Sequence, residues 1–394
     1  MTPLFNGNHI DLSMLRTHSF NLRWAEVEAG VIPLTAADPD FPVAMAIREA
    51  VSAFAMNGHF HYGPSKGTIA FREAVSNYFH YERSVSVSPA HILPTDSAAS
   101  AIYLICKSLL KPGDEVIVFD PVDFLFAYSV EEAAAIPVRM PLPGHAPIDI
   151  HHLESLITDR TRMICLCNPM NPTGKVFTQQ ELTQLGELAI RYNLIILSDE
   201  IWSDIVYEPH RFVSIASLSK EIAHQTVTVT GFSKSYGLAG LRIGALGTAS
   251  ADMFKAIEKT SGYAFTVQGV DVLAQVAATT ALTQCKSWLQ AFVQHLHQVR
   301  DLAVQRINQI EGFSCEAPQG TYLAWVDIRK TGLTAEQVQQ RLLEQARVSV
   351  VPGLERWFGP GAAGHIRISF ATTESLLNES FSRIEHTIIP VENR

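Results

Sequence analysis

Five short apolar runs, separated by stretches of helical spacing, constrain the fold more than any other feature of this chain. The runs are EVIVF (115–119), MICLC (163–167), LIILS (194–198), TVTVT (226–230) and IGALG (243–247). Apolar residues recur at helical spacing between several of them, most clearly over 178–192. Strands that are apolar on both faces are typical of a parallel sheet covered by helices. The sequence therefore predicts an α/β fold with a buried, largely parallel central sheet.

The pattern changes after about residue 285, where strands and helices become mixed. A long helical segment is followed by further strand-like and helical stretches, namely 286–310, TYLAWVDI (321–328), 335–346, SVVPG (349–353), HIRISFA (365–371) and a last helix. This mixture favours a second, smaller α+β domain. The N-terminal arm fits either unit by its pattern. We expect a large domain over 45–285 and a small domain built from 1–44 and 286–394.

Composition excludes several classes of function. The formal net charge is −9, and no Lys/Arg block of the kind that follows phosphates is present, which argues against nucleic-acid binding. No segment approaches the roughly 20 apolar residues that cross a bilayer, so we expect no membrane association. The five Cys are an odd number in a long chain, and the His pairs lack the spacing of helical metal ligands. We expect a cytoplasmic protein without a bound metal.

Three polar segments follow three of the predicted strands. They are NPMNPTGKVF (168–177), SDEIWSD (198–204) and GFSKSYGLAGLRIG (231–244). Parallel strands place their ligands at the carboxyl ends, so these segments are expected to meet at one edge of the sheet.

Lys234 and Arg242 together indicate the chemistry of this edge. A lysine amine forms a Schiff base with an aldehyde, and a guanidinium suits bidentate capture of a phosphate. A ligand that carries both groups is pyridoxal phosphate. Asp199 would then keep the pyridine nitrogen protonated, and Asn171 would donate to the ring's 3′-oxygen. Each residue alone also fits a plain turn or a helix cap.

With these motifs, the chain resembles the pyridoxal-phosphate enzymes of the aspartate aminotransferase superfamily, fold type I, class I/II. The matching pieces stand in the family's order and cover most of the chain: ADPDF (37–41), HYGPSKGTIAFREAV (61–75), NPTGKVF, SDEIW, SKSYGLAGLRIG and HIRIS (365–369). They are specific for the fold and the cofactor and poorly specific for the substrate.

The resemblance implies roles for individual residues. Lys234 holds the cofactor and shuttles the α-proton. Arg367 binds the substrate α-carboxylate, and Asn171 is a substrate contact as well as a cofactor contact. Tyr62 reaches the phosphate in the neighbouring subunit, which implies a homodimer. The remaining implied cofactor contacts are Asp199, Asn171, Arg242 and the segment of Ser97, Ala98 and Ala99 that opens a helix.

The sequence departs from the family pattern at four places. Ser97 replaces a glycine, and Asp123 stands where an aromatic residue stacks on the ring, so Phe124 is assigned that role. Trp202 replaces a Tyr and offers its indole N–H to the 3′-oxygen. Gly231 replaces a Ser or Thr, for which Ser233 or Thr230 compensates.

These departures leave the reaction open. We expect an aminotransferase that moves an amino group between an L-amino acid and a 2-oxo acid. ADPDF and SDEIWSDIVY also resemble the cystathionine β-lyase branch, so a carbon–sulfur β-lyase is the alternative. A non-catalytic ligand-binding module is a more distant one, because Lys234, Asp199 and Arg367 are intact.

Overall fold

The large sheet has seven strands, and six of them run in one direction. The computed structural model describes residues 5, 10–267, 269–385 and 387. The spatial order is β2-β8-β7-β6-β5-β3-β4, and only β8 is antiparallel to its neighbours. The strands are β2 (Ile92–Thr95), β3 (Glu115–Asp120), β4 (Ile136–Pro141), β5 (Thr161–Cys167), β6 (Ile195–Asp199), β7 (Thr226–Gly231) and β8 (Gly244–Thr248). The predicted α/β fold with a mostly parallel sheet is confirmed.

Helices enclose this sheet in two groups. The α5 helix contacts α6 and α10, whereas α8 contacts α7 and α9. The helices are α3 (Met45–Met56), α4 (Ile69–Arg83), α5 (Ala98–Leu109), α6 (Leu125–Glu132), α7 (Ile150–Ser155), α8 (Gln179–Arg191), α9 (Lys220–Gln225), α10 (Ala251–Ser261) and α11 (Val272–Gln284). Every residue of β3 and β7 is buried, as expected for strands covered on both faces.

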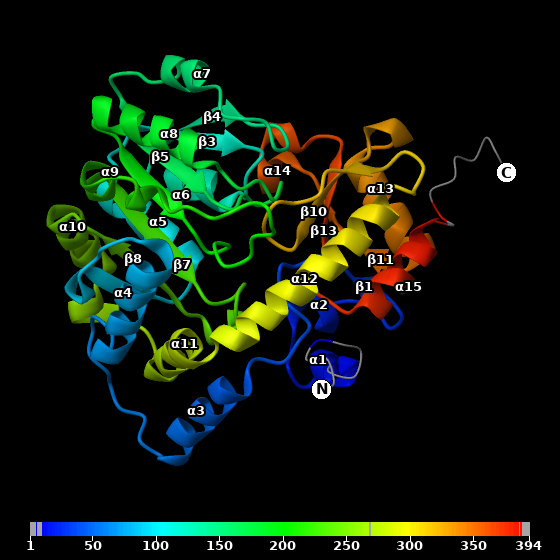
Figure 1. Cartoon of the computed structure of the whole chain (residues 1–394), viewed down its shortest axis with the longest axis horizontal. Helices are drawn as coiled ribbons and strands as arrows, with labels where there is room; N and C mark the ends of the chain where they lie inside the picture. The colour runs from blue at the N-terminus through cyan, green and yellow to red at the C-terminus, as the bar shows by residue number, and fades with distance from the viewer. Residues whose placement is uncertain (1–4, 6–9, 268, 386, 388–394) are drawn as a thin grey trace.

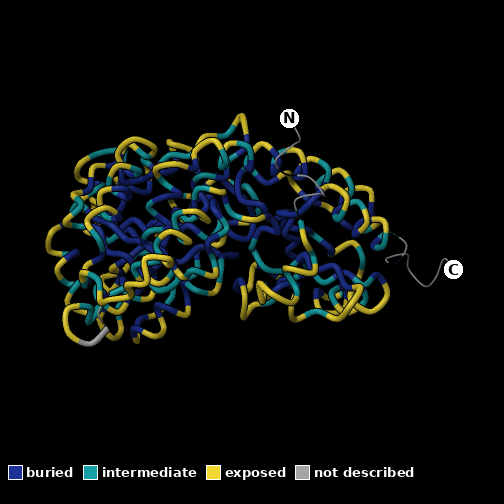
Figure 2. Tube along the Cα trace, turned by 90° about the horizontal axis from the view of Figure 1, so that it is seen from below, coloured by how far each residue is buried: buried dark blue, intermediate teal, exposed yellow. Residues whose placement is uncertain are grey.

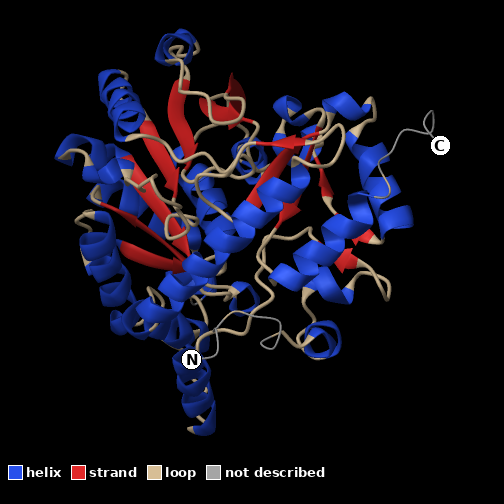
Figure 3. Ribbon diagram, turned by 45° about the vertical axis from the view of Figure 1, so that its right-hand side comes forward, coloured by secondary structure: helices blue, strands red, loops and turns tan. Residues whose placement is uncertain are grey.

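The C-terminal part forms a second, smaller sheet of antiparallel strands in the order β12-β13-β10-β9. Its strands are β9 (Ser314–Cys315), β10 (Leu323–Asp327), β12 (Val351–Pro352) and β13 (His365–Ser369), with helices α12 (Lys286–Ile307), α13 (Ala335–Arg341), α14 (Glu355–Phe358) and α15 (Glu374–Glu385). Helix α12 runs from α11 to this sheet, and the strands and helices of the small unit lie together at one end (Figures 1 and 3).

The N-terminal arm joins the small sheet region. Strand β1 (Ile32–Pro33) pairs in parallel with β11 (Val348–Ser349), and the short helices α1 (Leu12–Thr17) and α2 (Leu22–Ala25) precede it. This pairing agrees with placing residues 1–44 with 286–394, and the domain boundaries themselves stay a prediction. The largest hydrophobic core extends through both units, and the buried segments lie in the interior of the molecule (Figure 2).

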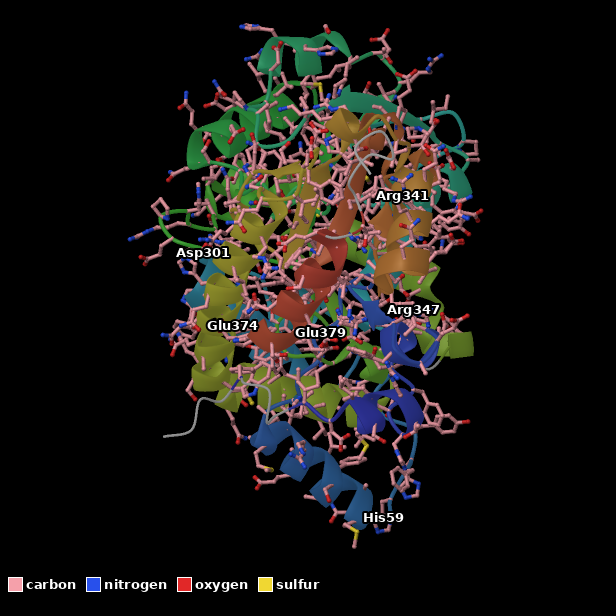
Figure 4. The ribbon with its side chains drawn as sticks, turned by 90° about the vertical axis from the view of Figure 1, so that its right-hand side faces the viewer. His59, Asp301, Arg341, Arg347, Glu374 and Glu379 are labelled. Carbon is pink, nitrogen blue, oxygen red and sulfur yellow. The ribbon has the colours of Figure 1, made fainter. Side chains whose placement is uncertain are left out.

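Helix α3 extends away from the main body. It packs against α11, and the loop that follows it carries His59 at the far tip of the molecule (Figures 1 and 4). Met56, Phe60 and Tyr62 in and after this helix are largely exposed.

Candidate active site

The three polar segments meet at the carboxyl ends of β5, β6 and β7, as the strand order requires. Cys167 at the end of β5 lies opposite Asp199 at the end of β6, and Asp199 lies opposite Val229 of β7. Lys234 follows the last residue of β7 by three positions. The chain therefore brings side chains from three separate segments to one edge of the sheet.

Lys234 is half-buried and is held by the N-terminal arm. Its Nζ donates to the backbone carbonyl of Ala37 at 2.7 Å, and the hydroxyl of Tyr322 donates to the same carbonyl at 3.0 Å. The amine also lies 5.5 Å from the ring centroid of Trp202. Burial lowers the pKa of the Lys234 amine, while the nearby carboxylate of Asp38 acts in the opposite direction. A lowered pKa favours the neutral, nucleophilic form of a lysine.

Asp199 is the last residue of β6 and is buried. Its Oδ1 accepts a hydrogen bond from the backbone N–H of Ile201 at 3.1 Å. Burial raises the pKa of Asp199 to about 7, and the charges of Asp123 and Glu200 contribute in the same direction. A cationic hydrogen-bond donor stabilises the ionised form of such a buried carboxyl group, and a protonated pyridine nitrogen is a donor of this kind.

Helix α5 points its N-terminus at this edge of the sheet. Ala98 and Ala99 are its first two residues, and Ser97 is the N-cap, whose Oγ accepts from the backbone N–H of Ser100 at 3.0 Å. The unpaired amides and the dipole of a helix N-terminus form an anion site.

Two glycines allow the neighbouring strands to approach this helix end. A Cβ at Gly244 would lie 2.7 Å from the carbonyl carbon of Ser97 and 2.8 Å from the amide nitrogen of Ala98. A Cβ at Gly231 would lie 2.9 Å from Ile201 Cδ1. The backbone of Ser97 and Ala98 therefore leaves no room for a side chain at Gly244.

Arg242 and Ser233 lie on the segments next to these glycines. Arg242 is exposed and adopts a left-handed φ of 50°, two residues before β8 begins. Ser233 is half-buried, and the buried Oγ of Ser235 has no hydrogen-bond partner among the described residues. A helix N-terminus, a guanidinium, a lysine amine and a buried carboxylate together fit the phosphate, aldehyde and ring nitrogen of pyridoxal phosphate.

Asn171 connects a cation to an anion. Arg367 Nη1 donates to Asn171 Oδ1 at 3.0 Å, and Asn171 Nδ2 donates to Asp123 Oδ2 at 2.7 Å. Arg367 Nη2 also donates to the carbonyl of Thr35 at 3.3 Å. The structure therefore places Arg367 of the small sheet directly beside the loop that follows β5.

The three other residues expected at the site differ in how deeply they are buried. Trp202 is buried, and its ring meets Tyr322 edge-on at 4.7 Å between centroids. Phe124 is 37% exposed, and its ring packs on Trp357 at 5.3 Å. Tyr62 is 92% exposed in the loop between α3 and α4. The structure thus brings Asp123, and not Phe124, into hydrogen bonding with Asn171, and the stacking role of Phe124 stays a prediction.

Sequence reasoning gave no role to Asp38, although it lies within ADPDF. Asn21 Nδ2 donates to Asp38 Oδ2 at 3.0 Å. Burial raises the pKa of Asp38, and the positive charges of Lys234 and Arg23 lower it. The signal in the sequence was ADPDF itself, which carried the family resemblance without an assigned function.

Two cavities open onto the site. A cavity of about 620 Å³ is bordered by Lys234, Asp38 and the N-terminal arm. A second cavity of about 450 Å³ is bordered by Arg367, Asp123, Phe124 and Trp357. Within the described part of the chain, no group of three His, Cys, Asp or Glu side chains has the arrangement of a metal site. No helix in that part is long and apolar enough to span a membrane.

Comparison with known proteins identifies the family. The family model described as "Aminotransferase class I and II" matches residues 29–384. An aspartate aminotransferase of Pyrococcus horikoshii is 32% identical, with 91% of this chain and 90% of the relative covered. The crystal structure of an aromatic aminotransferase from the same organism is 30% identical, with a TM-score of 0.85 and coverage of 92% and 96% of the two chains.

Cystalysin from Treponema denticola, whose structure contains pyridoxal 5′-phosphate, has a TM-score of 0.89 over 98% of both chains at 22% identity. That identity establishes a shared fold alone. The expected transamination is confirmed by the family and its relatives, as is the expected cofactor. The chain belongs to the class I and II aminotransferases, enzymes that transfer amino groups with pyridoxal 5′-phosphate.

Proposed function

We propose that this enzyme is a cytoplasmic homodimer that transfers the amino group of an L-amino acid with an apolar side chain to a 2-oxo acid. The observation that carries the proposal is the convergence of Lys234, Asp199, Asn171 and Arg367 at one edge of the sheet. These four side chains offer an amine, a buried carboxylate, an amide and a guanidinium, which match four different groups of cofactor and substrate.

Residues from the N-terminus of α5 to the end of β6 would hold the cofactor. The first turn of α5, which includes Ser97, Ala98 and Ala99, would bind its phosphate together with Ser233 and Arg242. Asp199 would accept a hydrogen bond from its ring nitrogen, and the amine of Lys234 would hold its aldehyde group.

Asn171 and the indole N–H of Trp202 would donate to the ring's 3′-oxygen. An amide nitrogen carries two hydrogens, so Asn171 Nδ2 can donate to Asp123 and to this oxygen at the same time.

Bound pyridoxal phosphate supplies a ring that accepts electrons from the substrate's α-carbon. The protein residues do the rest. Arg367 holds the α-carboxylate, Lys234 Nζ takes the α-proton and returns it, and the buried Asp199 keeps the ring nitrogen protonated. The lowered pKa of Lys234 suits it for accepting that proton.

The apolar side chain of the substrate is placed in the cavity of about 450 Å³ beside Arg367. Its walls include Val351, Trp357, Phe358 and Phe124. The guanidinium of Arg367 lies 5.2 Å from the ring centroid of Phe358, so the carboxylate anchor and the apolar wall are adjacent. An aromatic or branched side chain would bury apolar area here.

The homodimer is proposed from α3 and the loop after it. Tyr62, which is 92% exposed in the single chain, would contact the phosphate in the neighbouring subunit. Static light scattering of the purified protein measures the mass directly, and a monomer that binds cofactor normally would contradict this part of the proposal. Tyr62→Phe is expected to weaken cofactor retention without changing the dimer.

The spectrum of the purified protein tests the catalytic assignment. A visible band that borohydride removes is expected for the wild type. The reduction should leave the pyridoxyl group covalently attached to Lys234. L-phenylalanine should bleach that band, and a 2-oxo acid should restore it. Lys234→Ala should lose both the band and turnover, while Lys220→Ala, an exposed lysine at the start of α9, should keep both. Near-normal transamination by Lys234→Ala would refute the assignment. Pyruvate and ammonia released from a β-substituted amino acid would instead indicate the lyase.

A further inference from the structure

The amide of Asn171 holds a cation and an anion at its two ends. Arg367 Nη1 donates to its oxygen at 3.0 Å, and its nitrogen donates to Asp123 Oδ2 at 2.7 Å. Both Asn171 and Arg367 are buried. A guanidinium and a carboxyl group are therefore held one amide apart, close to Lys234. Burial raises the pKa of the Asp123 carboxyl, and the positive charges of Arg367 and Lys234 act in the opposite direction.

Each end of this arrangement is fixed by further hydrogen bonds. The backbone N–H of Asp123 donates to the carbonyl of Asn171 at 3.1 Å, and Asp123 Oδ1 accepts from the N–H of Leu125 at 3.2 Å. Arg367 Nη2 donates to the carbonyl of Thr35 at 3.3 Å. A charge pair that is already positioned binds a ligand without the cost of ordering its side chains.

Both charges remain open to a ligand. Asp123 and Arg367 border the same cavity of about 450 Å³. The Nε of Arg367 is buried and has no hydrogen-bond partner within the described residues. An unpaired donor of this kind is costly unless a ligand oxygen meets it.

The two substrates of a transamination differ in one charged group that Asp123 and Arg367 can distinguish. An α-amino acid carries an ammonium and a carboxylate on one carbon, whereas a 2-oxo acid carries only the carboxylate. We propose that Asp123 is a substrate-binding residue that contacts the α-ammonium while Arg367 binds the carboxylate, so that the site recognises the amino acid as a zwitterion. The proposal rests on the proposed function and extends it to the discrimination between the amino donor and the oxo acceptor.

The expected difference in affinity follows from the strength of the hydrogen bond between Asp123 and the α-ammonium. A hydrogen bond between two charged groups in a partly buried site contributes about 10- to 100-fold in affinity. Asp123 contributes nothing favourable to a 2-oxo acid, because its carboxylate faces another anion. The substitution Asp123→Asn removes the charge and keeps an oxygen that can accept from Asn171 Nδ2, so the shape of the site is retained.

The test measures binding to the holoenzyme by calorimetry with two non-reactive ligands. One is 3-phenylpropanoate, which has only the carboxylate. The other is N,N-dimethyl-L-phenylalanine, which has both charges and a tertiary amine that cannot condense with an aldehyde. In the wild type the zwitterion should bind about 10- to 100-fold more tightly, and Asp123→Asn should abolish that preference while 3-phenylpropanoate binds equally or more tightly.

A matched control is Asp120→Asn, three residues earlier, whose carboxylate accepts from the N–H of Gly361 at 3.0 Å outside this cavity. It should leave the preference unchanged. Equal weakening of both ligands by Asp123→Asn would show that Asp123 only supports the local structure and would overturn the proposal. An unchanged preference would overturn it as well.

If the wild-type holoenzyme binds neither ligand, the cavity is not the carboxylate site and the proposal is refuted. The borohydride-sensitive absorbance band would still be observed in that case, so this failure is distinct from a failure of the proposed function.

Discussion

Asp199 makes the stability of the cofactor-free enzyme depend on pH in a direction that can be worked out. Burial raises its pKa from an ordinary 3.8 to about 7 in the folded protein. The folded state therefore binds more protons than the unfolded state between these values, and the free energy of unfolding falls as pH rises. Each pKa unit corresponds to about 1.4 kcal/mol, and allowing for partial titration, the loss between pH 5 and pH 7 is about 2 kcal/mol.

The variant Asp199→Asn isolates this contribution. Asparagine keeps an oxygen for the N–H of Ile201 and cannot ionise. Urea unfolding of the cofactor-free wild type and variant, followed by circular dichroism at pH 5 and pH 7, gives the difference at each pH. Relative to the variant, the wild type should lose about 2 kcal/mol over this interval. Titrating groups that do not interact with Asp199 cancel when the two proteins are compared.

Asp327→Asn is the matched control. Its hydrogen bonds with Arg329 lower the pKa of Asp327, so this carboxylate is ionised in both states throughout the interval. The difference between wild type and control should therefore not change with pH. If the gap between wild type and Asp199→Asn is also constant within about 0.5 kcal/mol, the Asp199 carboxylate is charged in the folded protein and the burial argument is wrong. Bound cofactor should remove the pH-dependent loss, because a protonated ring nitrogen favours the ionised carboxylate.

Three further substitutions test the packing and the anchor. Gly244→Ala should lower the free energy of unfolding by about 1–3 kcal/mol and weaken phosphate binding, because its Cβ would clash with the backbone of Ser97. The control is Gly240→Ala, whose Cβ would meet no atom within 4 Å and should change neither quantity. Thermal unfolding and cofactor retention measure the two effects. Arg367→Gln should raise KM for both amino acid and 2-oxo acid by about 10- to 100-fold in steady-state kinetics, and an unchanged KM would exclude it as the carboxylate anchor. Phe292→Ala removes a fully buried ring and should lower the free energy of urea unfolding by about 3–5 kcal/mol; a loss below about 1 kcal/mol would contradict its place in the core.

The inner strands could be predicted because they are apolar on both faces. The runs 163–167 and 194–198 correspond to β5 (Thr161–Cys167) and β6 (Ile195–Asp199), with ends shifted by one or two residues. A continuous apolar run of this length, followed by a polar segment, leaves few alternatives to a buried parallel strand.

The two edge strands escaped sequence reasoning, and proline is the physical reason. Strand β2 contains Pro94, and β4 contains Pro137 and Pro141. Proline lacks the N–H that a central strand needs, so its presence argues against a strand when the position in the sheet is unknown. Both strands lie at the edges of the sheet, where one side of the backbone needs no partner. The reversed direction of β8 was equally hidden, because an apolar run carries no mark of orientation.

Site residues that follow a predicted strand could be identified from the sequence. Site residues that only the tertiary structure brings to the site could not. Lys234 and Asp199 stand directly after apolar runs, which reveals them. Asp38 comes from the N-terminal arm and meets Lys234 only through the tertiary structure. Phe124 already has helical backbone angles ahead of α6, so its side chain and that of Asp123 point in different directions. The residue that faces Asn171 could therefore not be chosen from the sequence.

The stretch from Ile32 to Ala37 ties the catalytic amine to the small sheet. Strand β1 is paired with β11, Leu34 accepts from the N–H of Ser369, and the Ala37 carbonyl accepts from Lys234 Nζ. An extended segment of six residues spans at most about 20 Å and has little slack once both ends are bonded. The position of the Lys234 amine is therefore fixed relative to the small sheet that carries Arg367, which sets the distance between the nucleophile and the carboxylate anchor.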